Sequence, residues 1–350
     1  MTSLAKGCLK IGIIGAGSWG TTLANLLAEK GMDVSLWVHG DDVYEAIVNR
    51  KENAVYLPRI TLSKGIHPTQ SLEEASHGKD VLVLAVPSHV FRETVSKLKS
   101  YVGDSCIILS ATKGIENDTL LTMSGILKEI LPLPLHDRLV CLSGPSFARE
   151  VAERQLTAVT VASRNQKMAE AIQTLFTTPF FRVYTSLDVI GVELGGALKN
   201  VIAIGAGISD GLGLGYNARA ALITRGIAEI SRLGVRLGAN PLTFAGLAGI
   251  GDLVLTCTAD LSRNRTVGLR LGRGMPLSDI LADMRMVAEG IATTKSAYDL
   301  SQRLTTEMPI TEQIYHVLYG NKSPKEAVKE LMDRAPKDEL ERGFFPWRSN

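Results

Sequence analysis

Lys199 is the residue of this chain best placed by its neighbours to do chemistry, because it lies within an otherwise apolar stretch. The residues spaced four apart around it are small and would share one face of a helix with it: Gly191, Gly195, Ala203 and Gly207. A face so bare of side chains lets a ligand or another backbone come close, and Lys199 would project into that space. The alternative is a helix–helix contact from which the lysine reaches water.

Asp252 is a second ionisable residue among apolar neighbours. A carboxylate buried without a partner is costly, and Lys199 is a partner that it could fix in position and whose pKa it could tune. Asn200 follows Lys199 directly. Residues 262–265 (Ser-Arg-Asn-Arg) then supply hydrogen-bond donors at the expected start of a helix, where arginine and free amides bind phosphate. Such a short basic run can also be plain surface.

Three polar, turn-forming segments each follow an apolar run: residues 86–89 (Val-Pro-Ser-His), 111–114 (Ala-Thr-Lys-Gly) and 143–146 (Ser-Gly-Pro-Ser). In open α/β sheets ligands bind outside the carboxyl ends of the strands, so these segments predict a substrate site. Lys113 belongs to it on this interpretation. Considered alone, Lys113 could equally be a solvated surface lysine.

A glycine-rich turn, residues 15–20 (Gly-Ala-Gly-Ser-Trp-Gly), follows the apolar run Leu9–Ile14 and precedes a helix-like segment. Gly15 would permit the tight turn, Gly17 would let a pyrophosphate approach the backbone, and Gly20 would let helix and strand pack closely. The free amides and the dipole of the helix would face the anion. The turn therefore predicts a dinucleotide site.

The choice between NAD and NADP stays open in the sequence. NAD-specific sites usually place an acidic residue at the end of the second strand, to bind the ribose 2′-hydroxyl. Here that strand ends at Val38 and His39, and Asp41 and Asp42 come slightly later. His39 could tolerate a 2′-phosphate or could be a solvated loop residue.

The elements that must position these residues fall into two groups. Buried parallel strands are expected at Leu9–Ile14, Asp33–Val38, Val81–Val86, Cys106–Ser110 and Leu139–Leu142, with helices between them. Two later strand candidates are Ala158–Ala162 and Phe181–Tyr184. This alternation predicts an α/β fold with a Rossmann-like doubly wound sheet over residues 1–188. Helices are expected at Asp188–Asp210, Ala218–Leu237, 263–271, 291–303, 309–318 and 324–333, which predicts an all-helical domain over 189–335. Residues 336–350 would form a flexible tail.

The amino-acid composition limits the classes of protein to which this chain can belong. The chain has 350 residues, of which 45% are hydrophobic and 21% charged, with a formal net charge of +2. Such a balance favours neither nucleic acid nor an anionic membrane as partner. Glycines interrupt the first apolar run, so we expect no signal peptide. Glu193 and Lys199, or Asp252, interrupt the later apolar stretches, so we expect no membrane span.

The four cysteines, Cys8, Cys106, Cys141 and Cys257, lie far apart and form no C-x-x-C pair. This spacing supports neither a zinc site nor a disulfide framework and suits a reducing cytosol. We therefore expect a cytoplasmic protein without a metal, with buried free thiols at Cys8, Cys106 and Cys141.

In these segments the chain resembles the bacterial NAD(P)-dependent glycerol-3-phosphate dehydrogenases over about residues 9–335. The resemblance includes residues 15–20, 87–91, 111–114, 143–148, 193–200, 209–213, 217–222, 251–253, 256–257 and 262–265. Their order and spacing together are highly specific. Ser146 stands where the family often has threonine, which keeps the hydroxyl, and Gly195 and Gly196 stand where some members have a larger residue.

The resemblance implies a role for each matched residue. Lys199 would be the proton acceptor in alcohol oxidation, with Lys113 and Asp252 beside it. The substrate would contact Lys113, Gly144, Ser146, Lys199, Asn200, Asp252, Ser262, Arg263 and Asn264. The dinucleotide would contact Gly15, Gly17, Ser18, Trp19, Gly20, His39, Lys113, Ala148, Arg263, Val287 and Glu289.

The implied reaction is reversible reduction of dihydroxyacetone phosphate to sn-glycerol 3-phosphate, which supplies the glycerophospholipid backbone. A lysine that serves both directions should have its pKa lowered toward ~7–8 by burial and cationic neighbours. We also expect a homodimer. Two alternative functions remain for the sequence. One is a β-hydroxyacid or 6-phosphogluconate-type dehydrogenase, whose substrate has a carboxylate. The other is a dinucleotide-sensing protein without hydride transfer.

Overall fold

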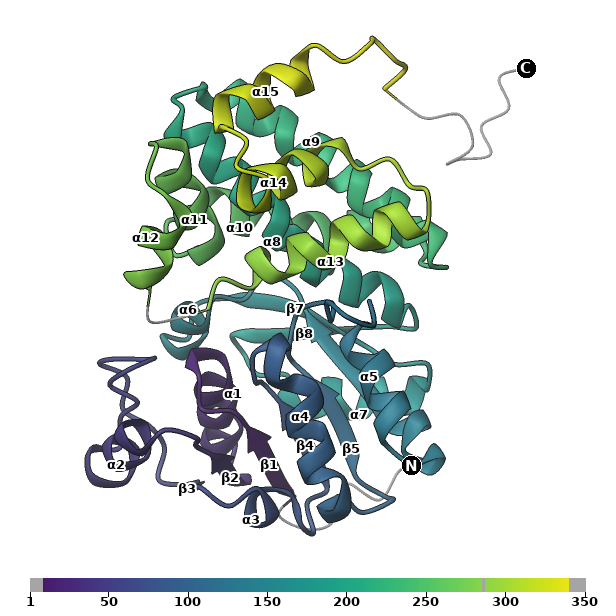
Figure 1. The fold of residues 1–350 in the computed structure, drawn as a ribbon. Helices are drawn as coiled ribbons and strands as arrows, with labels where there is room; N and C mark the ends of the chain where they lie inside the picture. Colours follow the sequence, from purple (N-terminus) through teal and green to yellow (C-terminus); the bar gives the residue numbers. More distant parts are fainter. Residues whose placement is uncertain (1–8, 285–286, 340–350) are drawn as a thin grey trace.

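The computed structural model describes residues 9–284 and 287–339. Its first part is an eight-stranded sheet with the strand order β3-β2-β1-β4-β5-β6-β7-β8 (Figure 1). The strands are β1 Lys10–Ile14, β2 Asp33–Trp37, β3 Ile66–Thr69, β4 Val81–Leu84, β5 Ile107–Ser110, β6 Leu139–Ser143, β7 Thr157–Ala162 and β8 Phe181–Ser186. All neighbouring pairs are parallel except β6 and β7. The predicted Rossmann-like doubly wound sheet is confirmed.

Helices cover both faces of this sheet, as the alternation of strands and helices predicts. They are α1 Ser18–Glu29, α2 Asp41–Arg50, α3 Leu72–Ser76, α4 Ser88–Leu98, α5 Met123–Ile130, α6 Ala148–Ala152 and α7 Gln166–Phe176. In β4, Val81 and Val83 pack with α1 and α7, whereas Leu82 and Leu84 pack with α4 and α5. Both faces of the strand are therefore buried, which explains its uninterrupted apolar sequence.

Two features of the sheet were not expected. Strand β3 pairs with β2 at the edge and contains His67 and Pro68, so it lacks the apolar run that identifies a buried strand. Strand β7 runs antiparallel to β6. The only helix between them, α6, has five residues and does not return the chain along the sheet.

The second part of the molecule is helical. It contains α8 Val189–Gly211, α9 Gly215–Arg236, α10 Asp252–Thr258, α11 Arg263–Gly272, α12 Leu277–Ala282, α13 Glu289–Arg303, α14 Pro309–Tyr319 and α15 Pro324–Met332. Within the described residues no strand follows β8, as predicted. Helices α10 and α12 were not predicted, because each is only two turns long or less. The proposed boundary at residues 188–189 stays a prediction, and most of the proposed tail lies outside the described residues.

Helix α8 is the centre of the helical part and contacts α9, α10, α11 and α13 (Figure 1). It is also long and apolar enough to cross a membrane by length and composition, despite Glu193 and Lys199. Two charged residues therefore do not exclude a membrane span at this helix, contrary to the expectation from the sequence. Its apolar window is 94% buried inside the protein, which is the placement of a core helix.

Candidate active site

The glycine turn has the geometry of a pyrophosphate site. Gly15 has φ +112°, and a Cβ there would lie 2.7 Å from the carbonyl oxygen of Ala85. A Cβ at Gly20 would overlap the carbonyl oxygen of Gly15, so helix and strand can pack only without a side chain. A Cβ at Gly17 would meet nothing within 4 Å, and no side chain caps the first turn of α1 there. The residues present fit a dinucleotide.

The ribose end of this site has no carboxylate at the end of β2. His39 is exposed, and its ring centroid lies 5.7 Å from that of Trp37. The carboxylate of Asp41 accepts a hydrogen bond from Gln70, 2.6 Å away, and that of Asp42 accepts one from the Val43 amide. The acidic residues thus begin α2 and already have partners.

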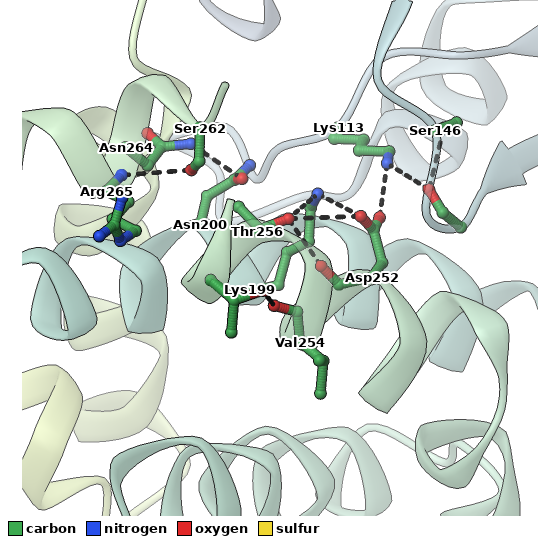
Figure 2. Close-up of polar contacts among 12 residues, drawn as sticks. Lys113, Ser146, Lys199, Asn200, Asp252, Val254, Thr256, Ser262, Asn264 and Arg265 are labelled. Atoms are coloured by element: carbon green, nitrogen blue, oxygen red, sulfur yellow. Dashed lines mark hydrogen bonds and ion pairs between the residues drawn. The ribbon is translucent and has the colours of Figure 1, made fainter. Parts of the chain in front are cut away.

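Lys199, Asp252 and Lys113 form one buried cluster, although they come from α8, the start of α10 and the loop after β5 (Figure 2). Lys199 Nζ lies 2.5 Å from Asp252 Oδ1, and Lys113 Nζ lies 2.6 Å from Asp252 Oδ2. The side chain of Asp252 is 1% exposed, that of Lys199 8% and that of Lys113 19%. The expected pairing of Lys199 with Asp252 is confirmed, and Lys113 is not a solvated surface lysine.

The cluster changes the acidity of its members. The pKa of Lys199 is lowered to about 8, mainly because the side chain is buried; the charge of Asp252 opposes this shift and the charge of Lys113 adds to it. Burial alone would raise the pKa of Asp252, but the two lysines hold it below its ordinary value. Lys199 therefore changes protonation state near neutral pH, while Asp252 stays ionised.

Thr256 is a partner of Lys199 to which the sequence analysis assigned no role. It lies four residues after Asp252, hence on the same face of α10, and its hydroxyl accepts a hydrogen bond from Lys199 Nζ at 2.7 Å. The same hydroxyl donates to the carbonyl oxygen of Asp252 at 2.6 Å. The four-residue spacing was the signal that could have identified it.

The loop after β6 borders the cluster. Gly144 has φ +133°, and its carbonyl oxygen accepts hydrogen bonds from Lys113 Nζ at 3.2 Å and Ser146 Oγ at 2.9 Å. Ala148 begins α6, and its carbonyl oxygen accepts a hydrogen bond from Thr22 of α1. The structure therefore brings Gly144 and Ser146 to the lysines, and it fixes Ala148 against the helix that follows the glycine turn.

The proposed phosphate-binding residues lie at the start of α11 (Figure 2). Ser262 caps this helix by accepting a hydrogen bond from the Arg265 amide. Asn264 Nδ2 donates to Asn200 Oδ1 at 2.9 Å, and Asn264 Oδ1 accepts from the Gly290 amide at 2.9 Å. Asn200 and Asn264 thereby join α8, α11 and α13.

Arg263 and Val287, both expected at the dinucleotide, contact each other. Arg263 is exposed, and its guanidinium donates to the carbonyl oxygen of Val287 at 2.7 Å. Glu289 instead binds the start of α4: its carboxylate accepts hydrogen bonds from the Ser88 amide, at 3.1 Å, and from the Ser88 hydroxyl. Glu289 therefore connects the helical part to a loop at the carboxyl edge of the sheet, a contact that sequence spacing could not reveal.

Three of the four cysteines lie within the residues that the structure describes. Cys106, Cys141 and Cys257 are buried free thiols, and burial raises the pKa of Cys106 and of Cys257 to about 12. The prediction is confirmed for Cys106 and Cys141, whereas Cys8 lies outside the described residues. Over residues 9–284 and 287–339, no three His, Cys, Asp or Glu side chains gather as metal ligands would.

A glycine turn of dinucleotide-binding geometry on a Rossmann-like sheet, together with a buried lysine on the core helix of a helical domain, defines a two-domain NAD(P)-dependent oxidoreductase. The profile described as NAD-dependent glycerol-3-phosphate dehydrogenase N-terminus matches residues 10–169, and the corresponding C-terminus profile matches residues 188–329. The chain belongs to this family, the NAD-dependent glycerol-3-phosphate dehydrogenases.

Individual relatives agree with this assignment. Glycerol-3-phosphate dehydrogenase (NAD(P)+) of Syntrophobacter fumaroxidans is 56% identical over 95% of this chain and 98% of that protein. The enzyme of the same name from Geobacter metallireducens is 57% identical over 94% of this chain and 98% of its own. The crystal structure of glycerol-3-phosphate dehydrogenase from Coxiella burnetii is 39% identical, has a TM-score of 0.87 and covers 93% of this chain and 99% of that one.

Proposed function

We propose that this chain reversibly reduces dihydroxyacetone phosphate to sn-glycerol 3-phosphate with NADH or NADPH. The observation that supports this most directly is the buried Lys113–Asp252–Lys199 cluster at the carboxyl edge of the dinucleotide-binding sheet. Two ammonium groups held by one carboxylate suit a carbonyl whose oxygen gains negative charge during reduction.

In this proposal Lys199 moves the proton. A bound nicotinamide supplies hydride to the ketone carbon, or takes it from the alcohol carbon in the reverse direction. The protonated Lys199 Nζ gives one proton to the oxygen, which becomes the hydroxyl, and neutral Lys199 accepts it in oxidation. A pKa of about 8 keeps both forms accessible near neutral pH.

The neighbouring residues position the reacting groups. Asp252 and Thr256 hold Lys199 Nζ in place, and Lys113 adds positive charge beside the carbonyl. Ser262, Arg263 and Asn264, with Asn200, would bind the phosphate at the start of α11, where free amides and a guanidinium favour an anion. Binding energy at the phosphate then helps to orient the ketone.

Residues of both parts would hold the dinucleotide. The pyrophosphate would lie over Gly17 and the amides of Ser18 and Trp19, between Gly15 and Gly20. His39 would lie near the adenine ribose, and Lys113, Ala148, Arg263, Val287 and Glu289 would complete the site. The absence of a carboxylate at the end of β2 leaves room for a 2′-phosphate, so NADP and NAD both fit.

The proposal extends to the cellular setting of this enzyme. We propose that it works in the cytoplasm as a homodimer without a membrane span, and that it supplies the glycerol phosphate backbone of phospholipids. Sedimentation of the purified protein tests the dimer. A mass equal to one chain across the working concentration range would contradict it.

The function is tested by initial rates of dihydroxyacetone phosphate reduction with NADH and NADPH in parallel. We expect rapid oxidation of at least one cofactor and sn-glycerol 3-phosphate as the product. β-Hydroxy acids serve as the comparison substrates, because a site with a lysine could also accept a carboxylate. Faster turnover of a β-hydroxy acid than of the phosphate substrate would overturn the proposal.

A further inference from the structure

A large apolar groove lies in the helical part, in addition to the candidate active site. Its volume is about 390 Å³, within the range of pockets that hold small ligands or peptide side chains. Helices α8, α9, α14 and α15 line it, with Ala221, Leu222, Ile314, Val328 and Leu331 among the residues on its walls. We call it the α9–α15 groove.

Part of this groove is uncovered apolar surface. Two of its lining residues, Leu214 and Met332, are 43% and 79% exposed. Contiguous apolar surface of this kind on a folded protein usually has an occupant.

The described chain ends at the rim of this groove. Arg334, Ala335 and Lys337 line it, and the carbonyl oxygen of Glu339 accepts a hydrogen bond from Arg225, another lining residue, at 3.1 Å. Arg334 and Lys337 both pair with Glu307, which fixes this last stretch against the helices. Whatever follows Glu339 therefore starts beside the groove.

The eleven residues that follow Glu339 are rich in aromatic side chains: Leu-Glu-Arg-Gly-Phe-Phe-Pro-Trp-Arg-Ser-Asn. Phe344, Phe345 and Trp347 lie within four positions. Five residues of extended chain span up to roughly 17 Å, so Phe344 can reach back into a groove that borders Glu339. Aromatic side chains bury large apolar areas, which is what the walls of the groove require.

We propose that residues 340–350 dock in the α9–α15 groove of the same chain through Phe344, Phe345 and Trp347. The charges at the rim favour this occupant over an anionic ligand. Arg225 donates a hydrogen bond to the carbonyl oxygen of Glu339, and Arg232 donates one to the carbonyl oxygen of Glu307. Arg334 and Lys337 form ion pairs with the carboxylate of Glu307. An anion would have to displace these partners, whereas apolar side chains would contact only the apolar residues that line the groove.

The test measures the environment of Trp347 in the full-length protein. The chain has three tryptophans, Trp19, Trp37 and Trp347, so the emission of Trp347 is the difference between the protein and its Trp347→Phe variant. Docking predicts emission at shorter wavelength than that of a free tryptophan amide, and protection from quenching by acrylamide. Emission and quenching equal to those of the free amide would overturn the proposal.

A pair of neighbouring variants locates the docking surface. Ala221 and Ala220 are adjacent, exposed residues of α9, but only Ala221 lines the groove. Ala221→Glu should remove the protection of Trp347, and Ala220→Glu should retain it. Equal retention in both variants would overturn the proposal, because the segment would then dock elsewhere. Protection that disappears on dilution together with the dimer would also overturn it, because a second copy would then be the occupant.

Discussion

At the scale of single residues, the side chains of Lys113, Asp252 and Lys199, which are far apart in the sequence, form one hydrogen-bonded cluster. Each oxygen of the Asp252 carboxylate accepts from a different lysine, so the two cations are held on either side of one buried anion. Burial of a lysine favours its neutral amine, and the carboxylate limits this effect. The carboxylate that holds Lys199 in position therefore also limits how far burial lowers its pKa.

Lys199→Met should reduce kcat for dihydroxyacetone phosphate by ~10²–10⁴-fold, the range typical of a lost general acid–base group. Asp252 keeps Lys113 as a partner in this variant, so no carboxylate is left unpaired. Steady-state rates give kcat, and titration with NADH or NADPH should show unchanged cofactor affinity. Near-normal turnover with both ligands bound would contradict the assigned role.

The pH dependence should follow the pKa of Lys199, which lies at about 8. Reduction needs the ammonium form, so kcat/KM for reduction should be constant below that pH and fall above it. Oxidation needs the neutral amine, so its kcat/KM should rise with pH and level off above it. Asp252→Asn removes the charge that raises this pKa and should move both breaks to lower pH. Profiles without a break near pH 8 would exclude Lys199 as the titrating group.

At the scale of secondary-structure elements, the three glycines of the turn between β1 and α1 are required for different reasons. Gly15 and Gly20 allow backbone to approach backbone, whereas Gly17 faces open space. Of the three glycines, Gly17 is therefore the one whose missing side chain leaves space for a ligand.

Gly17→Ala should fold normally but raise the KM for the dinucleotide roughly tenfold or more, a loss of ~1.4 kcal/mol or more. Gly20→Ala should destabilise the protein itself by ~1–3 kcal/mol, because its methyl group would overlap the Gly15 carbonyl oxygen. Thermal unfolding and cofactor kinetics measured on both variants separate the two effects. The control is Gly103→Ala in an exposed loop, where a Cβ also meets nothing within 4 Å. An unchanged KM in Gly17→Ala would place the pyrophosphate elsewhere.

At the scale of the whole molecule, carboxylates of the helical part bind the starts of helices that cover the sheet. Glu193 of α8 accepts from the amide and hydroxyl of Ser124 in α5, at 2.7 and 2.6 Å. Glu289 of α13 accepts from the same two groups of Ser88 in α4. A negative charge at a helix N-terminus is favourable, so both contacts stabilise the arrangement of the two parts.

Glu289→Ala should lower the free energy of unfolding by about 1–2 kcal/mol, since the contact is charge-assisted but half-buried. Ser88→Ala removes one of the same hydrogen bonds. The double variant should therefore lose less stability than the two single losses added together. Denaturation in urea of the four proteins measures this. Strictly additive losses would show that the two residues are not energetically coupled.

The sequence alone determined the parts of this protein that depend on local pattern. Apolar residues identified seven of the eight strands, because each of those strands buries at least one face in the core, although β8 alternates buried and exposed positions. The glycine turn was recognisable because Gly15 and Gly20 lie against backbone of the adjacent strand or of the turn itself, while Gly17 leaves the space that a ligand needs. The edge strand β3 and the short helices α10 and α12 lacked such a pattern and were missed.

Only the tertiary structure decided which distant residues act together. Lys113, Lys199 and Asp252 are separated by tens of residues, and their mutual hydrogen bonds arise because α8 and α10 pack beside the loop after β5. Tertiary packing also gave Lys199 its second hydrogen-bond partner, Thr256, and gave Glu289 a partner 201 positions earlier in the chain. Spacing in a sequence fixes which residues share a helix face, whereas burial, charge pairing and the resulting pKa depend on what that face packs against.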